Sequence, residues 1–489
     1  MRASGILMPV FSLPENYGIG TLGNEAYKFI DFLSNSGQKY WQILPLGPTS
    51  YGDSPYQSYS SFAGNPYFID LELLKKEGLL EKSEIEGFDF GNDPNYIDYS
   101  KLYNNRYTVL KIAFSRFTKN NDYENFLNSE KHWLLDFALF MALKSKNGGV
   151  PWYNFSEDLK HRNESAIEKI RQEYALEIEF QFFIQYEFFK QYRELKNYAN
   201  FKGIKIIGDI PIYTSLDSAD VWSSPSQFLL DENLNPTLVA GCPPDSFVPS
   251  GQLWGNPLYN WAKMKNDGFS FWKKRLDKCL KMYDVVRIDH FRAFESYFAI
   301  PFGSHDARNG HWEKGPGRHF FDEIRKCFGE NLPIIAEDLG HITPEVESLL
   351  EYTGFPGMKI MQFGFSGDYN NPYLPQNYKN NCVVYLGTHD NPTTRSWFEL
   401  LSHNEKCFLK NYLNEQNENN IIGALINAAL NSAGDTVILT VQDLLNLKDE
   451  ARINTPGAVG QNWKWRMSKD ILTKEIEQNL YKLTKNSVR

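Results

Sequence analysis

Short runs of apolar, largely β-branched residues recur along the chain, and stretches with apolar residues at helical spacing separate them. Continuous apolar runs of this length are typical of strands that are buried on both faces of a parallel sheet. Such runs occupy residues 5–10, 40–45, 204–212, 284–289, 333–338, 358–363, 382–386 and 437–441. Helical stretches such as 320–328 and 344–352 lie between them. This alternation predicts an α/β fold, a (β/α)8 TIM barrel of parallel strands.

A doubly wound parallel sheet is the alternative with the same alternation of strands and helices. Such a sheet commonly carries a glycine-rich phosphate-binding turn directly after its first strand. The segment after the first apolar run reads FSLPENYGIG (residues 11–20), which has no third glycine and no start of a helix. The pattern therefore favours the barrel.

Two intervals between the predicted strands are much longer than the usual connection of about 2–6 residues. Residues 66–200 lie between the second and third runs, and their apolar spacing predicts a mainly helical insertion. The aromatic stripe over 164–200 is more typical of core packing than of a binding surface. Residues 213–283 follow the third run and are rich in Gly, Pro, Asn and Trp, which predicts a loop-rich insertion. We therefore expect one barrel domain over residues 1–489 with two inserted subdomains.

Composition and charge narrow the class of protein. The 489 residues are 42% hydrophobic and 23% charged, which is ordinary for a globular protein and excludes a disordered chain. With 51 Lys and Arg against 60 Asp and Glu, the formal net charge is −9, which argues against nucleic acid or an anionic membrane as the main partner. Aromatic residues reach 15%, which suits a large core and equally a site that stacks flat ligand faces.

No targeting or membrane-spanning segment is predicted. No apolar run reaches the roughly 18 residues that a membrane span needs, and Pro9 and Pro14 interrupt the start of the chain. The five cysteines are widely spaced and contain no C-x-x-C pair, so neither a disulfide framework nor a zinc knuckle is indicated. These features predict a cytoplasmic protein with reduced thiols.

Charged residues gather where the predicted strands end. Asp209 lies in the third run, Asp289 ends the fourth, Glu337 lies near the end of the fifth, and His389 and Asp390 follow the seventh. One carboxylate at the end of a buried strand can simply anchor hydrogen bonds. Several carboxylates that converge on one mouth are harder to explain in that way, because clustered like charges destabilise a fold. Their position at the carboxyl ends of barrel strands favours acid–base or nucleophilic catalysis.

Two of these carboxyls are expected in opposite protonation states. Arg287 and Asp289 are two residues apart, so on a strand they share a face, and the guanidinium should lower the pKa of Asp289. Glu337 follows an apolar segment, which should raise its pKa. One ionised and one protonated carboxyl are what the cleavage of a glycosidic bond requires. Taken alone, the Arg287–Asp289 pair is equally compatible with a structural buried ion pair.

Several motifs together resemble the α-amylase clan and, more narrowly, the 4-α-glucanotransferase family, also called amylomaltase or disproportionating enzyme. The motifs nearest the carboxylates are VRIDHFRAF (286–294), IIAEDLG (334–340) and GTHDNPT (387–393). Five further segments fit the same family: SLPENYGIG (12–20), YGDSPYQS (51–58), GDIPIY (208–213), PPDSFVPSGQLWGNPLYNW (243–261) and TPGAVGQNW (455–463). Any one of them is weak evidence, but the set spans nearly the whole chain.

The resemblance implies a role for each matching residue. Asp289 would be the nucleophile that forms a covalent β-glucosyl intermediate, Glu337 the general acid and then base, and Asp390 the carboxylate that holds sugar hydroxyls. Arg287 would position Asp289, and His389 would bond to the donor sugar. The implied substrate contacts are Tyr51, Ser54, Tyr56, Asp245, Trp254 and Asn256.

The resemblance also implies the reaction and its ligands. The protein would move a segment of α-1,4-glucan from a donor to the 4-hydroxyl of an acceptor, with maltooligosaccharides and α-glucans as partners. No cofactor or metal is expected, because the spacing of His305, His311 and His319 matches no zinc pattern. An α-amylase-like hydrolase with the same carboxylates is the nearest alternative, and a glucan-binding protein that has lost catalysis is another.

Overall fold

A computed structural model describes residues 2–50, 52–244, 248–458 and 460–489. Its centre is an eight-stranded parallel sheet with the order β10-β11-β12-β1-β2-β3-β6-β9. The strands are β1 (Ala3–Leu7), β2 (Tyr40–Gln42), β3 (Lys205–Ile210), β6 (Val285–Ile288), β9 (Ile334–Ala336), β10 (Gly357–Ile360), β11 (Cys382–Tyr385) and β12 (Thr436–Thr440). The two edges meet where the Ala336 N–H donates to the Pro356 carbonyl oxygen at 3.0 Å. The predicted (β/α)8 barrel is confirmed.

Side chains alternate between the inside and the outside of this barrel. The inward row forms a separate cluster of buried side chains: Leu7, Ile207, Ile335, Met358, Ile360, Val383, Tyr385 and Ile438. The same alternation runs on through Asp209, Arg287 and Glu337, since Asp209 pairs with Arg287 and Arg287 pairs with Ile335. The period of the strands therefore carries these polar side chains into the mouth of the barrel.

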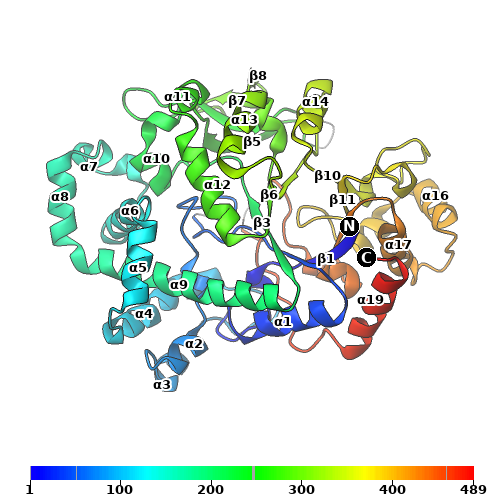
Figure 1. The fold of residues 1–489 in the computed structure, drawn as a ribbon, viewed down its shortest axis with the longest axis horizontal. Coiled ribbons are helices and arrows are strands. Elements are labelled where there is room, and N and C mark those ends of the chain that lie inside the picture. Colours follow the sequence, from blue (N-terminus) through cyan, green and yellow to red (C-terminus); the bar gives the residue numbers. More distant parts are fainter. Residues whose placement is uncertain (1, 51, 245–247, 459) are drawn as a thin grey trace.

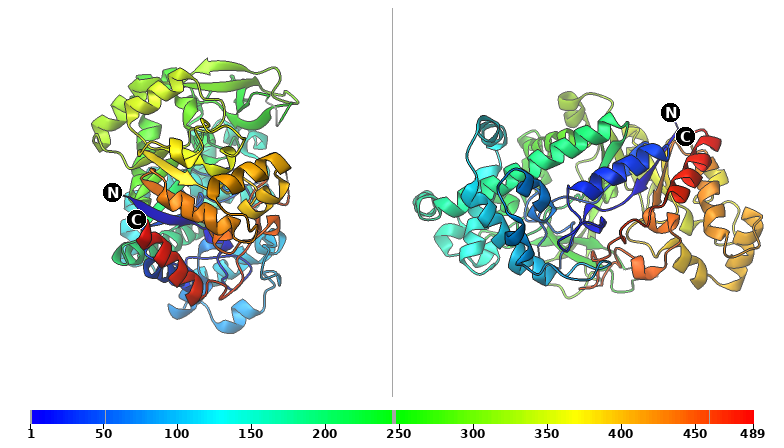
Figure 2. Two further views of the ribbon diagram at one scale, coloured as in Figure 1. Left: turned by 90° about the vertical axis from the view of Figure 1, so that its right-hand side faces the viewer. Right: turned by 90° about the horizontal axis from the view of Figure 1, so that it is seen from below.

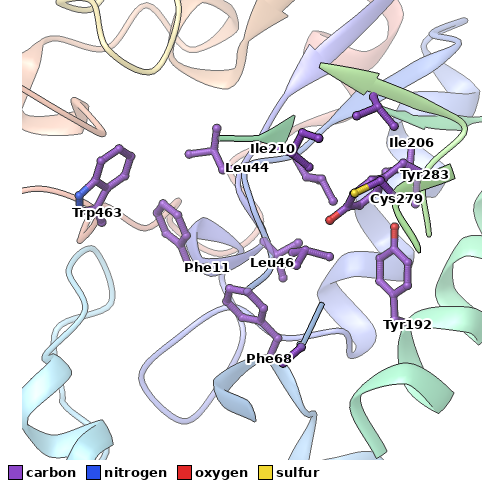
Figure 3. Packing of buried hydrophobic residues seen from close by; sticks show 14 of the residues in the cluster. Phe11, Leu44, Leu46, Phe68, Tyr192, Ile206, Ile210, Cys279, Tyr283 and Trp463 are labelled. Atoms are coloured by element: carbon purple, nitrogen blue, oxygen red, sulfur yellow. The ribbon is translucent and has the colours of Figure 1, made fainter. Parts of the chain in front are cut away.

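The outer face of β3 packs against the end of helix α12 (Ser270–Met282). Ile206 and Ile210 point toward Tyr283, as Figure 3 shows. Gly208 lies between them in the strand, and a Cβ at this position would come within 2.2 Å of the Tyr283 ring. Only glycine fits there without a shift of that ring. Tyr192 links α9 to the end of α12, because its hydroxyl donates to the Met282 carbonyl oxygen at 3.0 Å.

The segment between β2 and β3 is dominated by helices. They are α2 (Leu71–Lys76), α3 (Lys82–Glu86), α4 (Tyr99–Arg116), α5 (Asn121–Glu130), α6 (Leu134–Lys146), α7 (Glu157–Lys160), α8 (Glu164–Glu173) and α9 (Ala175–Phe201). The aromatic stripe of α9 is core, as expected, because Phe188 and Tyr192 are 0% and 4% exposed. The helical stretch predicted from residue 164 is interrupted at Tyr174, where α8 ends and α9 begins.

Two buried glutamines fasten α9 to the chain that leaves β2. The side-chain amide of Gln185 donates to the Gly64 carbonyl oxygen and accepts from the Gly64 N–H, both at 2.8 Å. Gln191 binds the backbone of Asp70 in the same way, at 2.7 and 3.3 Å. Both glutamines are buried, so these bonds are shielded from water.

The sequence pattern did not predict a second sheet, which is antiparallel and has the order β5-β4-β7-β8. It combines β4 (Leu238–Cys242) and β5 (Gln252–Pro257) with β7 (Ser296–Pro301) and β8 (His311–Lys314). The first two lie in the segment expected to be loop-rich, which also holds α10 (Ala219–Ser223), α11 (Trp261–Asn266) and α12. Gly241 in β4 and Gly255 in β5 weaken the strand pattern in the sequence. The strand β7, which pairs with β4, follows β6 in the sequence.

The remaining helices cover the barrel and both ends of the molecule. They are α1 (Asn24–Asn35), α13 (Gly317–Phe328), α14 (Pro344–Thr353), α15 (Thr394–Leu400), α16 (His403–Leu413), α17 (Ile421–Asn431), α18 (Val441–Leu444) and α19 (Lys474–Asn486). Figures 1 and 2 place the helices between β2 and β3 at one end of the long axis and α16 at the other. The two termini lie side by side, and the Arg489 guanidinium donates to the Ala3 carbonyl oxygen at 3.3 Å.

Candidate active site

An arginine at the mouth of the barrel is shared by two aspartates. Arg287 Nη1 lies 2.7 Å from both carboxylate oxygens of Asp209 and 3.0 Å from Oδ1 of Asp289. The Arg287 and Asp209 side chains are 3% and 0% exposed, whereas Asp289 is 29% exposed and faces the cleft. Asp209 is thus the buried partner that holds the guanidinium in place beneath Asp289. From the sequence alone, Asp209 is recognisable only as a carboxylate near the end of a predicted strand.

Glu337, directly after β9, is held by two backbone N–H groups. Its Oε2 accepts from the His290 N–H at 2.6 Å, and its Oε1 accepts from the Leu339 N–H at 2.8 Å. His290 adopts a left-handed conformation with φ 52°, which turns its N–H toward the glutamate. Burial lowers the pKa of His290 to about 3, so its ring is neutral and adds no charge beside Glu337.

Burial dominates the protonation of the carboxyl pair. It raises the pKa of Asp289 to about 8, although Arg287 opposes the shift and the Glu337 carboxylate adds to it. Burial also raises the pKa of Glu337. The expectation that Arg287 would lower the pKa of Asp289 below its usual range is wrong, because the effect of burial outweighs that of the guanidinium, which Asp209 also binds. Two buried carboxyls that repel each other retain one proton between them near neutral pH.

His389 and Tyr56 extend the hydrogen-bond network across the mouth. The Tyr56 hydroxyl donates to Asp209 Oδ2 at 2.9 Å and lies 2.9 Å from His389 Nε2. Since the hydroxyl proton is given to Asp209, Nε2 of His389 must carry the hydrogen that it donates to the Tyr56 oxygen. Burial lowers the pKa of His389, which keeps the ring neutral. Its Nδ1 has no hydrogen-bond partner among the residues that the structure describes.

Asp390 is the most exposed of the three predicted catalytic carboxylates. Its side chain is 42% exposed, and Oδ2 lies 3.4 Å from His389 Nε2. The Asn454 side-chain amide donates to Oδ1 at 2.6 Å, and Arg452 Nη2 donates to the backbone oxygen at 3.0 Å. One oxygen of Asp390 is therefore anchored while the other faces the cleft. No sequence pattern pointed to Asn454, which is distant in the chain.

The cleft has a volume of about 580 Å³, and Asp289 and Asp390 lie in its lining. Its walls are aromatic. The Trp254 ring stands perpendicular to the His290 ring at 4.9 Å, and the Tyr56 ring lies 5.8 Å from that of Trp463. Apolar ring faces with polar tips suit a sugar, which offers the same combination.

The other predicted substrate contacts divide into three groups. Ser54 lines the cleft, and its hydroxyl accepts from the Tyr56 N–H at 3.3 Å. Asn256 also lines the cleft, but its amide is already engaged: it accepts from Gln57 Nε2 at 3.1 Å and donates to the Thr214 carbonyl oxygen at 3.1 Å. It therefore joins two loops. Tyr51 and Asp245, which were predicted to bind substrate, lie outside the described residues.

The described part of the chain contains no group of three His, Cys, Asp or Glu residues placed to hold a metal ion. Within the same ranges, none of the helices combines the length and apolar character needed to cross a membrane.

Comparison with known proteins identifies the family. Residues 8–473 match the model of glycoside hydrolase family 77, which is described as 4-alpha-glucanotransferase. A 4-alpha-glucanotransferase of Clostridium butyricum is 49% identical over 98% of this chain and 99% of its own length. The corresponding enzyme of Thermus thermophilus is 46% identical over 95% of each chain. The structure of an amylomaltase from Streptococcus agalactiae in complex with acarbose superposes with a TM-score of 0.98 at 44% identity and covers 100% of both chains. The chain therefore belongs to the 4-α-glucanotransferases of glycoside hydrolase family 77, enzymes that act on α-1,4-glucans.

Proposed function

We propose that this chain transfers α-1,4-glucan segments by a retaining double displacement, with Asp289 as nucleophile and Glu337 as general acid and then base. The observation that carries this proposal is the geometry of two carboxyls at the barrel mouth: Arg287 Nη1 lies 3.0 Å from Asp289, and two backbone N–H groups hold Glu337. Such a pair holds one proton, so that one member is ionised while the other can donate. We assign the negative charge to Asp289, which contacts Arg287, and the proton to Glu337.

In the first step, the Glu337 proton passes to the glycosidic oxygen as the bond from that oxygen to the anomeric carbon breaks. An Asp289 oxygen forms a bond to the same carbon, and the shortened glucan leaves with a new hydroxyl. Glu337 is then ionised, and its two bonds from the His290 and Leu339 N–H groups stabilise that charge. In the second step, Glu337 takes the proton of an acceptor 4-hydroxyl, the acceptor oxygen attacks the anomeric carbon, and Asp289 is released.

Asp390 and His389 are assigned to holding the donor sugar. Asp390 has one anchored and one exposed oxygen, which suits a pair of neighbouring sugar hydroxyls. His389 is fixed by Tyr56 on its Nε2 side, so its ring is oriented before substrate arrives. Interactions of this kind contribute most when they strengthen at the oxocarbenium-like transition state.

Transfer prevails over hydrolysis only if an acceptor hydroxyl reaches the glycosyl-enzyme more often than water does. The Trp254 loop and the loop carrying Tyr56 both line the cleft, and Gln57 joins them through Asn256. We assign these walls to excluding water after the first product leaves. This shielding separates the proposed enzyme from an α-amylase-like hydrolase with the same carboxyls.

The proposed ligands are maltooligosaccharides and longer α-glucans. The Streptococcus agalactiae relative was solved with acarbose, which supports an oligosaccharide in the corresponding cleft here. We propose a cytoplasmic location, in keeping with the buried free thiols of Cys279 and Cys382. We also propose that residues 66–200 and 213–283 act as two insertions of one catalytic barrel.

The test is the product pattern from maltotriose alone. We expect glucose and a ladder of longer maltodextrins from the unaltered enzyme. Asp289→Asn should remove turnover while glucan binding persists. Glu337→Ala should slow turnover by about 10²–10⁴-fold, and azide should restore the release of an activated donor as the α-glycosyl azide. Turnover that survives in Asp289→Asn, or a β-azide product, would contradict these assignments.

A further inference from the structure

A groove with uncharged walls lies on the surface between α16, α17 and the loop that follows β10. It has a volume of about 550 Å³. Tyr369 and Gln376 come from the loop, Asn411 and Tyr412 from α16, and Asn427 from α17. Of the described residues that line it, none is charged, although 23% of the chain is.

Hydrogen bonds within the loop after β10 fix the shape of this groove. The Asn377 side-chain amide donates to the Tyr369 and Asn371 carbonyl oxygens, both at 2.8 Å. Gln376 Nε2 donates to the Tyr369 carbonyl oxygen at 3.1 Å. The Tyr369 ring packs against the Phe408 ring of α16, with 4.9 Å between centroids, and so joins the loop to that helix. The two walls are therefore held at a fixed spacing before any ligand arrives.

The side chains of this groove suit a neutral, hydroxyl-rich chain. Tyr369 is 56% exposed, and its ring is propped edge-on by Phe408 at 4.9 Å. Exposed amides of Gln376, Asn411 and Asn427 offer both donors and acceptors around that ring. A sugar presents an apolar face to stack on an aromatic ring and hydroxyls to bond to amides. A phosphate or an acidic peptide would find no counter-charge here.

The segments that form the groove follow the carboxyl ends of two barrel strands. Its loop leaves the carboxyl end of β10 through the turn η6 (Met361–Phe363), and α16 follows the carboxyl end of β11. Asp289 and Glu337 lie at the carboxyl ends of β6 and β9 in the same parallel sheet.

We propose that this groove is a second glucan-binding site, separate from the cleft, that holds a distant part of a long α-1,4-glucan. The proposal rests on the transfer activity of the enzyme and adds a surface that short substrates do not use. It predicts that the groove changes the apparent affinity for polymers and leaves the chemistry unchanged.

The experiment compares a long and a short substrate in variants of opposite walls. Tyr369→Ala removes the aromatic face from the loop, and Ala424→Trp fills the groove from α17 without altering the loop. Each variant should raise KM for amylose about three- to tenfold and leave kcat/KM for maltotriose unchanged. Tyr481→Ala is the matched control, because Tyr481 is a 45% exposed tyrosine on α19 that does not line the groove.

Retention in a native gel that contains glycogen gives a second readout in the Asp289→Asn background, where turnover does not consume the glycogen. We expect the glycogen gel to retain both groove variants more weakly than the Asp289→Asn parent. Tyr481→Ala should be retained as strongly as that parent. An unchanged KM for amylose in both variants overturns the proposal, as does an equal loss with maltotriose. A dimer that Ala424→Trp dissociates would instead assign the groove to contact between copies. Failure of the unaltered enzyme to elongate maltotriose would count against the catalytic proposal and not against the groove.

Discussion

Arg287 lies closer to Asp209 than to Asp289, since Nη1 is 2.7 Å from the former and 3.0 Å from the latter. The buried aspartate has no exposure to the cleft, whereas Asp289 faces it. The guanidinium is therefore anchored by a residue that does not contact substrate, and only part of its charge is available to the nucleophile. The way in which Arg287 divides its charge between Asp209 and Asp289 therefore affects the reactivity of Asp289.

Asp209→Asn tests the division directly. Arg287 would then be compensated by Asp289 alone, and the negative charge of Asp209, which raises the pKa of Asp289, would be lost. We expect kcat/KM to fall about 10–100-fold, because Arg287 and Tyr56 each lose a charged hydrogen-bond partner. The acidic limb of the pH–rate profile should move to lower pH. Asp231→Asn, in an exposed loop, is the control that should leave both the rate and the profile unchanged.

The raised pKa of Asp289 predicts how stability depends on pH. An aspartate titrates near 3.9 when unfolded, and burial raises the pKa of Asp289 to about 8 in the folded chain. Burial raises the pKa of Glu337 as well, so between these values the folded Asp289–Glu337 pair holds a proton that the unfolded chain has lost, and the pair makes the fold less stable as pH rises. Asp289→Asn removes the repulsion between the two carboxyls and so weakens this effect. In calorimetry, its Tm should exceed that of the parent at pH 8, and the difference should shrink toward pH 5. A difference that is constant across this range would show that burial does not govern this carboxyl.

Gln57→Ala should change what the glycosyl-enzyme reacts with. The substitution breaks the bond between Gln57 and Asn256 that joins the two cleft walls at 3.1 Å. Water should then enter more often, so hydrolysis should rise severalfold relative to transfer while cleavage of the donor continues. The ratio of new reducing ends to released glucose, measured with maltotriose, reports this change. Gln416→Ala, on the exposed surface, should keep the parental ratio.

Gly208→Ala should destabilise the barrel without touching the carboxylates. The added Cβ would lie 2.2 Å from the Tyr283 ring, which must move or distort the strand. Overpacking of this kind costs about 1–3 kcal/mol or more, and denaturant unfolding measures it. The double variant Gly208→Ala/Tyr283→Ala should recover part of the loss that the clash causes, relative to Tyr283→Ala alone. No recovery would mean that the ring is not the obstacle.

The barrel was predictable because its strands are continuous apolar runs that end at charged residues. The inward period of two also anticipated that Arg287 and Asp289 share a face. Other relationships depend on which strands are neighbours, which a single sequence does not reveal. The pairing of Asp209 with Arg287 follows from the contact of β3 with β6. Asn454 and Asp390 are 64 residues apart in the sequence, and no motif includes both of them.

The protonation states of the site residues were also not predictable from the sequence alone. Sequence spacing identified the guanidinium that favours an ionised Asp289, but the degree of burial that opposes it depends on the complete fold. The second sheet was missed for a related reason. The hairpin of β4 and β5 joins that of β7 and β8 only through the pairing of β4 with β7, which follows the next barrel strand, and local propensity does not indicate this pairing.

The amides of Gln185 and Gln191 bear on how the molecule unfolds. Each satisfies a backbone N–H and a backbone carbonyl group of the chain between β2 and α2, at Gly64 and Asp70, inside the protein. If α9 separated from the barrel, it would expose or strand all of these groups at once, in addition to its aromatic core face. The helices between β2 and β3 and the barrel are thus parts of one cooperative unit, and we expect a single unfolding transition rather than early release of the helical region to proteases.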